Sequence, residues 1–140
     1  MRIVTNSSAE TEALGERIAS RLTGGEVLAL FGPMGMGKTA FTRGLAHGLG
    51  VKGEVSSPTF ALVHEHAGKI PLYHFDMYRV ASWDDLYSTG FFDYLESTGV
   101  LVIEWSENIE GALPETAVRI VVSPGEMEDQ RIFEIEGLEL

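Results

Sequence analysis

Cysteine is absent from the 140 residues of this chain. Its absence excludes disulfide bonds, thiolate catalysis and cysteine-based metal sites, and it is consistent with a reducing compartment. Long apolar runs are absent too, since no stretch approaches the ~20 residues that a membrane-spanning helix needs. Polar residues follow the first few positions closely, which leaves no apolar core for a signal peptide. We therefore expect a cytoplasmic protein that does not enter a membrane.

Basic residues are scarce, with 10 Lys and Arg against 21 Asp and Glu and a formal net charge of -11. Affinity for a nucleic-acid backbone comes mainly from basic side chains that release counterions, so direct binding of nucleic acid is disfavoured. A partner would have to hold any nucleic acid involved. The acidic balance also means that a phosphate-bearing ligand needs a local positive site within this negative field.

The spacing of apolar residues indicates one α/β domain that spans residues 1–140. A helix is predicted after Ser7, because Ser7 followed by Glu10 matches a capping box. Residues 59–65 and 71–76 alternate as strands around a turn, which predicts a β-hairpin. Further strands are expected at residues 2–4, 26–31, 100–103, 118–122 and 131–135, and further helices at 39–49 and after Ser82.

A glycine-rich segment lies between the predicted strand at 26–31 and the predicted helix at 39–49. It reads Gly32-Pro33-Met34-Gly35-Met36-Gly37-Lys38-Thr39 and fits the phosphate-loop pattern G-x-x-x-x-G-K-[ST]. The glycines let the backbone turn tightly and point amides at phosphate oxygens, and the following helix adds its positive end. Lys38 supplies charge to the outer phosphates and Thr39 offers a hydroxyl to Mg²⁺. This segment is the local positive site, and it predicts binding of ATP with Mg²⁺.

Two carboxylates end predicted strands and are candidates for a second metal contact. Glu104 follows the apolar run at 100–103, and Asp76 ends the strand at 71–76. An acid at a strand end is often a surface charge or a helix cap, so each assignment has an ordinary alternative. We assign Glu104 to the metal and expect Asp76 to orient water or to contact Mg²⁺ through water. His64, His66 and His74 show no metal-ligand spacing and are interpreted as structural or surface residues.

Missing motifs narrow the class of nucleotide-binding protein. Asn occurs only at positions 6 and 108, so the Asn-Lys-x-Asp guanine signature is absent and a GTPase is disfavoured. A nucleotide kinase would need several arginines in a lid for its second substrate, whereas the downstream arginines here are scattered. A kinase for a nucleotide or small metabolite, and a nucleotide-gated binding module with negligible chemistry, stay open as alternatives.

An ordered set of motifs resembles one family closely. The phosphate loop GPMGMGKT is followed by FTRGLAHGLG, SSPTFALVHE, YHFDMYR and LVIEW, and together they cover nearly the whole chain. This set resembles the TsaE family of YjeE-type ATPases. The resemblance implies a P-loop NTPase-like three-layer α/β sandwich with a mixed, parallel and antiparallel, central sheet.

The resemblance also implies a function. The family binds ATP with Mg²⁺, hydrolyses it weakly alone, and acts with the TsaB and TsaD proteins. Those proteins install the threonylcarbamoyl group on adenosine 37 of tRNAs that read codons beginning with A. ATP hydrolysis is thought to reset that complex between turnovers, so this chain would contact tRNA only indirectly.

Site residues follow by position in the matching motifs. The resemblance implies catalytic roles for Asp76 and Lys38, and metal ligation by Thr39 and Glu104. The nucleotide would contact Ser8, Gly32, Pro33, Met34, Gly35, Met36, Gly37, Lys38, Thr39, Ala40, Thr59, Trp105 and Arg131. One departure is clear, because the family usually has Asp-Leu-Gly-Ala where this chain has residues 33–36. Pro33 removes one amide from the loop, and Met36 replaces a small residue.

Overall fold

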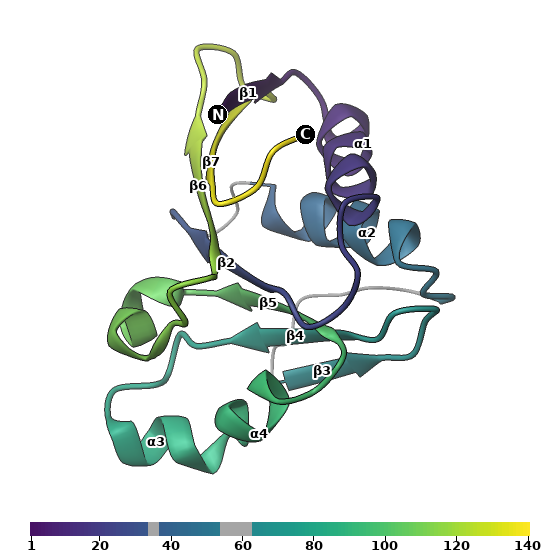
Figure 1. Cartoon of the computed structure of the whole chain (residues 1–140). Helices are drawn as coiled ribbons and strands as arrows, with labels where there is room; N and C mark the ends of the chain where they lie inside the picture. The colour runs from purple at the N-terminus through teal and green to yellow at the C-terminus, as the bar shows by residue number, and fades with distance from the viewer. Residues whose placement is uncertain (34–36, 54–62) are drawn as a thin grey trace.

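A single mixed sheet organises the computed structural model, which describes residues 1–33, 37–53 and 63–140. Within these residues the strand order is β1-β7-β6-β2-β5-β4-β3 (Figure 1). The central pairs β6·β2, β2·β5 and β5·β4 are parallel, and the outer pairs are antiparallel. The strands are β1 (Arg2–Thr5), β2 (Val27–Phe31), β3 (Val63–His66), β4 (Leu72–Asp76), β5 (Val100–Glu104), β6 (Val118–Pro124) and β7 (Arg131–Glu136).

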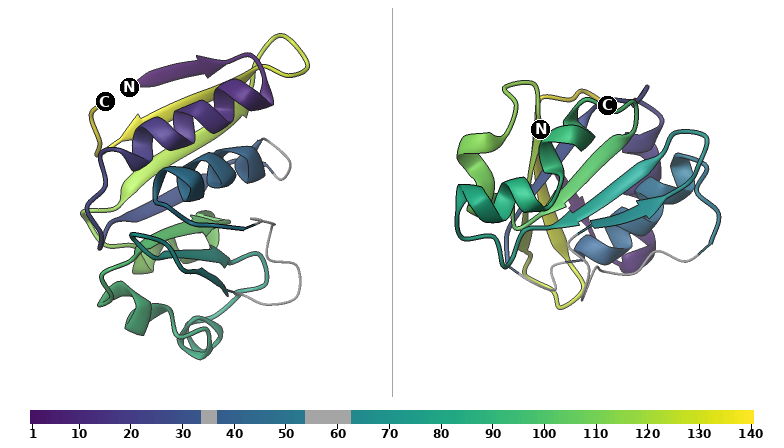
Figure 2. Two further views of the ribbon diagram at one scale, coloured as in Figure 1. Left: turned by 90° about the vertical axis from the view of Figure 1, so that its right-hand side faces the viewer. Right: turned by 90° about the horizontal axis from the view of Figure 1, so that it is seen from below.

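Helices cover the two faces of this sheet. The long helices α1 (Ser8–Ala19) and α2 (Lys38–Gly48) lie side by side against one face (Figures 1 and 2). The short helices α3 (Trp83–Ser88) and α4 (Phe91–Leu95) and the 3₁₀ helix η1 (Ser106–Ala112) pack on the other side. The three-layer α/β architecture with a mixed sheet is thus confirmed. The helices within the described ranges are too short or too polar to cross a membrane.

Alternation along the central strands divides the core into two clusters. Val100 and Val102 of β5 pack with α1 and α2, whereas Leu101 and Ile103 pack with α3, α4 and η1. Successive side chains of a strand point to opposite faces, so Glu104 continues the series of Val100 and Val102. The same alternation places Asp76 of β4 on the face that α2 covers.

Two glycines bring α1 and α2 into backbone contact. A Cβ atom on Gly44 would lie 1.9 Å from the Glu12 carbonyl oxygen, and one on Gly15 would lie 2.3 Å from the Phe41 carbonyl oxygen. Any larger side chain at either position would push the helices apart. This contact fixes the position of α2 against α1. Because α2 begins directly after the phosphate loop, the contact also helps to position the end of that loop.

The local predictions hold with small shifts. The Ser7 hydroxyl accepts from the Glu10 N–H at 3.1 Å, as the capping box predicts. The Glu10 carboxylate instead accepts from the Asn6 N–H, at 3.3 Å, so the reciprocal half of the box is displaced by one residue. Strands β3 and β4 form the predicted antiparallel hairpin, although residues 59–62 of its first strand lie outside the described residues. Helix α2 begins at Lys38, one residue before its predicted start.

Candidate nucleotide-binding site

The connection from β2 to α2 has a backbone that requires glycine at both described ends. Gly32 has φ 125°, and a Cβ atom there would lie 2.2 Å from the Val122 carbonyl oxygen. Gly37 has φ 81° and is the N-cap of α2, so no side chain caps the first-turn amides of that helix. Backbone amides and the helix dipole make the N-terminus of a helix favourable for an anion. Gly32 and Gly37 therefore have a backbone reason to be glycine.

Lys38 is buried at the start of α2, with a relative exposure of 3%. Its ammonium donates to the Gly32 carbonyl oxygen at 2.6 Å and lies 5.5 Å from the centre of the Trp105 ring. Burial lowers the pKa of Lys38, and the nearby carboxylates of Glu104, Glu107 and Asp76 oppose that shift only in part. The structure thus brings the sequence-predicted lysine together with both predicted acids.

Asp76 and Glu104 are direct register partners at the carboxyl ends of β4 and β5. Because these strands are parallel, both carboxylates lie at the sheet edge where β2 runs into the phosphate loop. Clefts at this edge of an open α/β sheet are the usual ligand sites of such folds. One Asp76 oxygen, Oδ1, accepts from the Tyr78 N–H at 3.0 Å.

His74 binds the Glu104 carboxylate directly. Its Nε2 atom lies 2.7 Å from Glu104 Oε2, and the side-chain exposures are 1% and 14%. The other ring nitrogen, Nδ1, has no hydrogen-bond partner in the part of the chain that the structure describes. The interpretation of His74 as structural missed this contact. Its place two residues before Asp76, on the same face of the sheet, was the available signal.

Trp105 turns the chain from β5 into η1. Its backbone is left-handed, with φ 59° and ψ 41°, which is rare for a residue with a large side chain. The indole packs against Tyr78 with ring centroids 4.9 Å apart. The turn also brings Glu107 back to the loop, where its Oε2 accepts from the Gly32 N–H at 3.1 Å. No sequence pattern singled out Glu107.

Arg131, at the start of β7, reaches the phosphate loop from the far end of the sequence. Its Cγ lies 3.6 Å, and its Nε 3.9 Å, from where a Cβ atom on Gly37 would stand. Arg131 Nη1 donates to the carbonyl oxygens of Glu128 and Gln130 at 2.6 and 2.9 Å, whereas its buried Nε has no partner among residues 1–33, 37–53 and 63–140. The structure therefore places Arg131 beside Gly37 of the loop.

The oxygen donors near the loop suit a hard divalent cation. Thr39 is in the first turn of α2, and Glu104 carries a carboxylate at the same sheet edge. Hydroxyl and carboxylate oxygens are ligands that Mg²⁺ accepts, and Mg²⁺ is commonly held by one or two protein groups together with substrate phosphates. Within the described ranges no group of three or more His, Asp and Glu side chains could hold a metal ion without such help.

The model of one protein family, threonylcarbamoyl adenosine biosynthesis protein TsaE, matches residues 5–133. The chain belongs to the TsaE family. The match includes the phosphate loop, both strand-end acids and Arg131, so the fold and the described site fall within one family pattern.

TsaE proteins of several bacteria are similar to this chain. The Treponema pallidum protein is 42% identical over 120 residues, which cover 86% of this chain and 89% of the relative. The Bacillus subtilis protein is 41% identical over 114 residues, which cover 81% and 71%. Both are described as tRNA threonylcarbamoyladenosine biosynthesis protein TsaE. The crystal structure of Bacillus subtilis YdiB superposes with a TM-score of 0.78 at 34% identity, covering 95% of this chain and 82% of that one.

Three of the remaining residues expected at the nucleotide lie in the described part of the chain. Ala40 is buried in α2, and Pro33 is exposed at the start of the loop. Ser8 lies in the exposed first turn of α1, one turn before Thr11, whose methyl group is 3.9 Å from the Cβ position of Gly37. Met34, Gly35, Met36 and Thr59 lie outside the described residues.

Proposed function

We propose that this TsaE-family chain is a Mg²⁺-dependent ATPase that acts in tRNA threonylcarbamoyladenosine biosynthesis. The observation that carries the proposal is the meeting of Lys38, Glu104 and Asp76 at the carboxyl edge of the central strands, beside an uncapped helix N-terminus. This arrangement offers positive charge for phosphates, oxygen ligands for a metal and a carboxylate for water at one place.

The phosphates are held by the loop and by Lys38. In the structure the Lys38 ammonium rests on the Gly32 carbonyl oxygen. A bound triphosphate would offer that ammonium stronger acceptors, because hydrogen bonds between charged groups are about twice as strong as neutral ones. Arg131 lies close enough to Gly37 to add a second positive charge at the loop.

A Mg²⁺ ion would be held by the Thr39 hydroxyl and the Glu104 carboxylate together with phosphate oxygens. When bound, Mg²⁺ supplies charge neutralisation at the phosphates. His74 holds Glu104 Oε2, which orients the carboxylate and leaves Oε1 for the metal or its water. Outer-shell partners of this kind commonly determine how well a ligand is placed.

Asp76 is the candidate for positioning the attacking water. The backbone N–H of Tyr78 fixes Asp76 Oδ1, so Oδ2 can accept a hydrogen bond from water. A carboxylate so held would orient the water and accept its proton as the bond from the water oxygen to the γ-phosphorus forms and the bond from that phosphorus to the bridging oxygen breaks, with ADP as the leaving group. Lys38 supports the same step by compensating charge on the outer phosphate.

The partners in this proposal are TsaB and TsaD. The chain carries a net charge of -11, so tRNA would be held by these partners and reached only indirectly. A cytoplasmic location belongs to the same proposal, since tRNA modification takes place there.

Phosphate release from ATP, measured for the chain alone and with TsaB and TsaD added, tests this function. We expect slow release alone, a clear rise with both partners, and loss of the rise in Asp76→Asn while ATP binding persists. Phosphate transfer to an acceptor other than water would instead indicate a kinase. ATP-dependent partner binding that is unchanged by Asp76→Asn, with no phosphate release under any condition, would indicate a gated binding module.

A further inference from the structure

The segment from Val80 to Val118 contains no Lys, Arg or His. The same segment carries Asp84, Asp85, Asp93, Glu96, Glu104, Glu107, Glu110 and Glu115. It builds strand β5 of the sheet and the short helices α3, α4 and η1, which form the layer opposite α1 and α2. Asp84 and Asp85 lie on α3 and Asp93 lies on α4, so this layer carries negative charge with no basic residue of its own.

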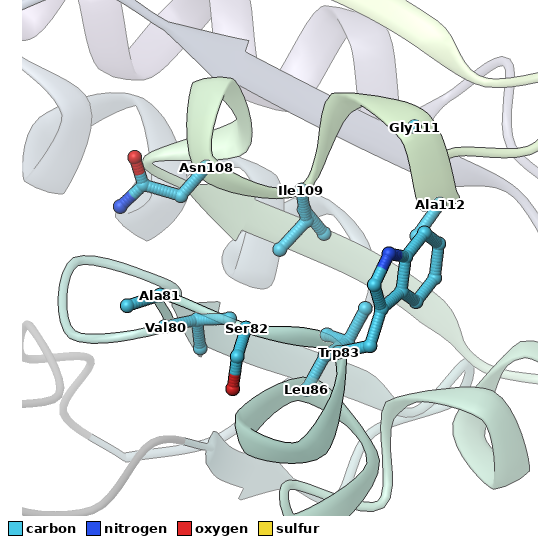
Figure 3. A pocket seen from close by; sticks show the side chains of 9 residues that line it. All are labelled: Val80, Ala81, Ser82, Trp83, Leu86, Asn108, Ile109, Gly111 and Ala112. Atoms are coloured by element: carbon cyan, nitrogen blue, oxygen red, sulfur yellow. The ribbon is translucent and has the colours of Figure 1, made fainter.

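This acidic layer contains a hollow of about 290 Å³ between α3 and η1 (Figure 3). Val80, Leu86 and Ile109 give it an apolar floor, and each of these side chains is largely buried. Asn108 lies at one end and Trp83 at the other, as the close view shows. The hollow is thus apolar at its base and polar at its rim, which is typical of a site that accepts one side chain of a partner.

Exposed aromatic side chains extend the hollow across α3 and α4. Trp83 and Tyr87 are 56% and 64% exposed. Phe92 joins them, with ring centroids 6.5 Å from Trp83 and 4.8 Å from Tyr87. Trp and Tyr are enriched at the centres of protein interfaces and uncommon as isolated surface residues. We call the hollow and these three rings the aromatic platform.

We propose that the aromatic platform docks a basic segment of a partner protein, with an apolar side chain of that segment seated in the hollow. Lys or Arg beside it would meet the carboxylates of α3 and could stack on Trp83 or Tyr87. A second copy of this chain is disfavoured, because two such acidic layers would repel. Nucleic acid is excluded by the same charge. The inference rests on the proposed function in one respect, since it takes the partner to be the complex of TsaB and TsaD.

The platform is linked to the catalytic acids through Asn108. The Asn108 amide nitrogen donates to the carbonyl oxygens of Met77 and Tyr78 at 2.9 and 3.2 Å, so it holds the chain directly after Asp76. The Met77 N–H in turn donates to the Glu104 carbonyl oxygen at 3.0 Å. A partner seated against Asn108 therefore contacts the residue that positions this segment. Docking at the platform would alter hydrolysis with less effect on ATP binding.

Affinity for an immobilised TsaB–TsaD complex tests the proposal, using the full chain at low and at physiological salt. Trp83→Ala removes the indole at one end of the hollow and should weaken binding to the complex at least tenfold, as expected for a residue at an interface centre. Asp84→Asn should weaken it less and reduce its salt dependence. Matched controls are Met127→Ala, 70% exposed in the β6–β7 turn, and Glu134→Gln, exposed on β7, which should both bind like the wild type. Each variant should keep its wild-type ATP affinity, which verifies folding.

The outcomes separate this inference from the proposed function. If Trp83→Ala and Asp84→Asn both bind the complex as tightly as the wild type does, the inference is wrong and the ATPase proposal is unaffected. Should Trp83→Ala abolish self-association of the chain instead, the occupant is a second copy and the inference is again wrong. If the wild type does not bind the complex, the proposed partners and this inference fail together. Loss of binding in Trp83→Ala, in a chain that releases no phosphate under any condition, would support the inference and overturn the ATPase.

Discussion

His74 Nε2 and Glu104 Oε2 lie 2.7 Å apart and join the ends of two parallel strands through their side chains. The histidine is buried on β4, and the glutamate ends β5 at the phosphate-loop edge of the sheet. The contact restricts the rotation of a carboxylate that would otherwise be free to adopt several rotamers. We therefore expect it to matter for how Glu104 meets a metal rather than for the fold alone.

Replacing His74 tests that expectation. His74→Leu fills the same space but leaves Glu104 without its donor, and it should reduce the gain in ATP affinity that Mg²⁺ provides by about tenfold. His74→Gln retains an N–H that can reach Glu104 and should recover most of that gain. ATP affinity with Mg²⁺ and with EDTA, measured by calorimetry, gives the comparison. Equal Mg²⁺ gains in the two variants, at equal thermal stability, would show that the contact has no role in metal binding.

We expect Lys38 to lower the free energy of unfolding of the ligand-free protein, although ATP binding requires it. Burial lowers its pKa below the ordinary value of 10.5, so the folded state disfavours the charged form. Lys38→Met should therefore abolish ATP binding yet raise the free energy of unfolding without ligand by about 1 kcal/mol. Between the two pKa values the unfolded chain binds more protons, so wild-type stability rises with pH. The stability advantage of Lys38→Met should shrink as pH approaches 10.5, which urea unfolding at several pH values would reveal.

Tyr94 should titrate well above the ordinary tyrosine pKa of 10. Its hydroxyl donates to Glu65 Oε1 at 2.7 Å, and this hydrogen bond, with lesser help from burial and from the Glu65 charge, raises the pKa of Tyr94 to about 12. A raised pKa means that the contact stabilises the fold fully below pH 10 and that this stabilisation is lost as pH rises through about 12. Absorbance titration should show a tyrosine ionisation near pH 12, and the midpoint of that ionisation should shift towards pH 10 in Glu65→Gln.

The glycine contact between α1 and α2 predicts an unusual response to alanine. Gly44→Ala would gain up to about 1 kcal/mol in helix propensity, but its methyl group would meet the Glu12 carbonyl oxygen at 1.9 Å. We expect a net loss of about 1–3 kcal/mol in the free energy of unfolding. Gly111→Ala is the matched control, because its methyl group would meet only Trp83, at 4.0 Å. Thermal unfolding that ranks the two variants equally would contradict the steric account.

The local pattern of the sequence predicts much of this fold. Alternating and continuous apolar runs gave the strands, and the glycine spacing gave the loop between β2 and α2. Lys38, Asp76 and Glu104 were found because each has a chemical type and a position at an element end. Both acids were assigned to one metal site, but their direct pairing across β4 and β5 was not predicted, because register between residues 28 apart in sequence depends on tertiary packing.

Three contacts at the site depend on tertiary structure. Glu107 reaches Gly32 because Trp105 adopts a left-handed backbone, a conformation that side-chain type does not predict for tryptophan. His74 is recognisable as a ligand of Glu104 only once β4 and β5 are paired. Arg131 approaches Gly37 only because the β6–β7 hairpin returns the chain to the loop. The resemblance to TsaE proteins implied a position near the nucleotide for Arg131, but the residues alone did not.

Alternation along β5 has a consequence for how this protein can vary in length. Removing one residue from within β5 would turn Glu104 away from α2 and place Trp105 at the strand position that faces α2. The Gly68-Lys69 turn and the Ser97-Thr98 connection lie at the opposite ends of β4 and β5. Insertions or deletions there leave the pairing of Asp76 with Glu104 unchanged. Relatives should therefore differ in loop length at that far edge, while the number of residues between the buried valines of β5 and its terminal acid stays constant.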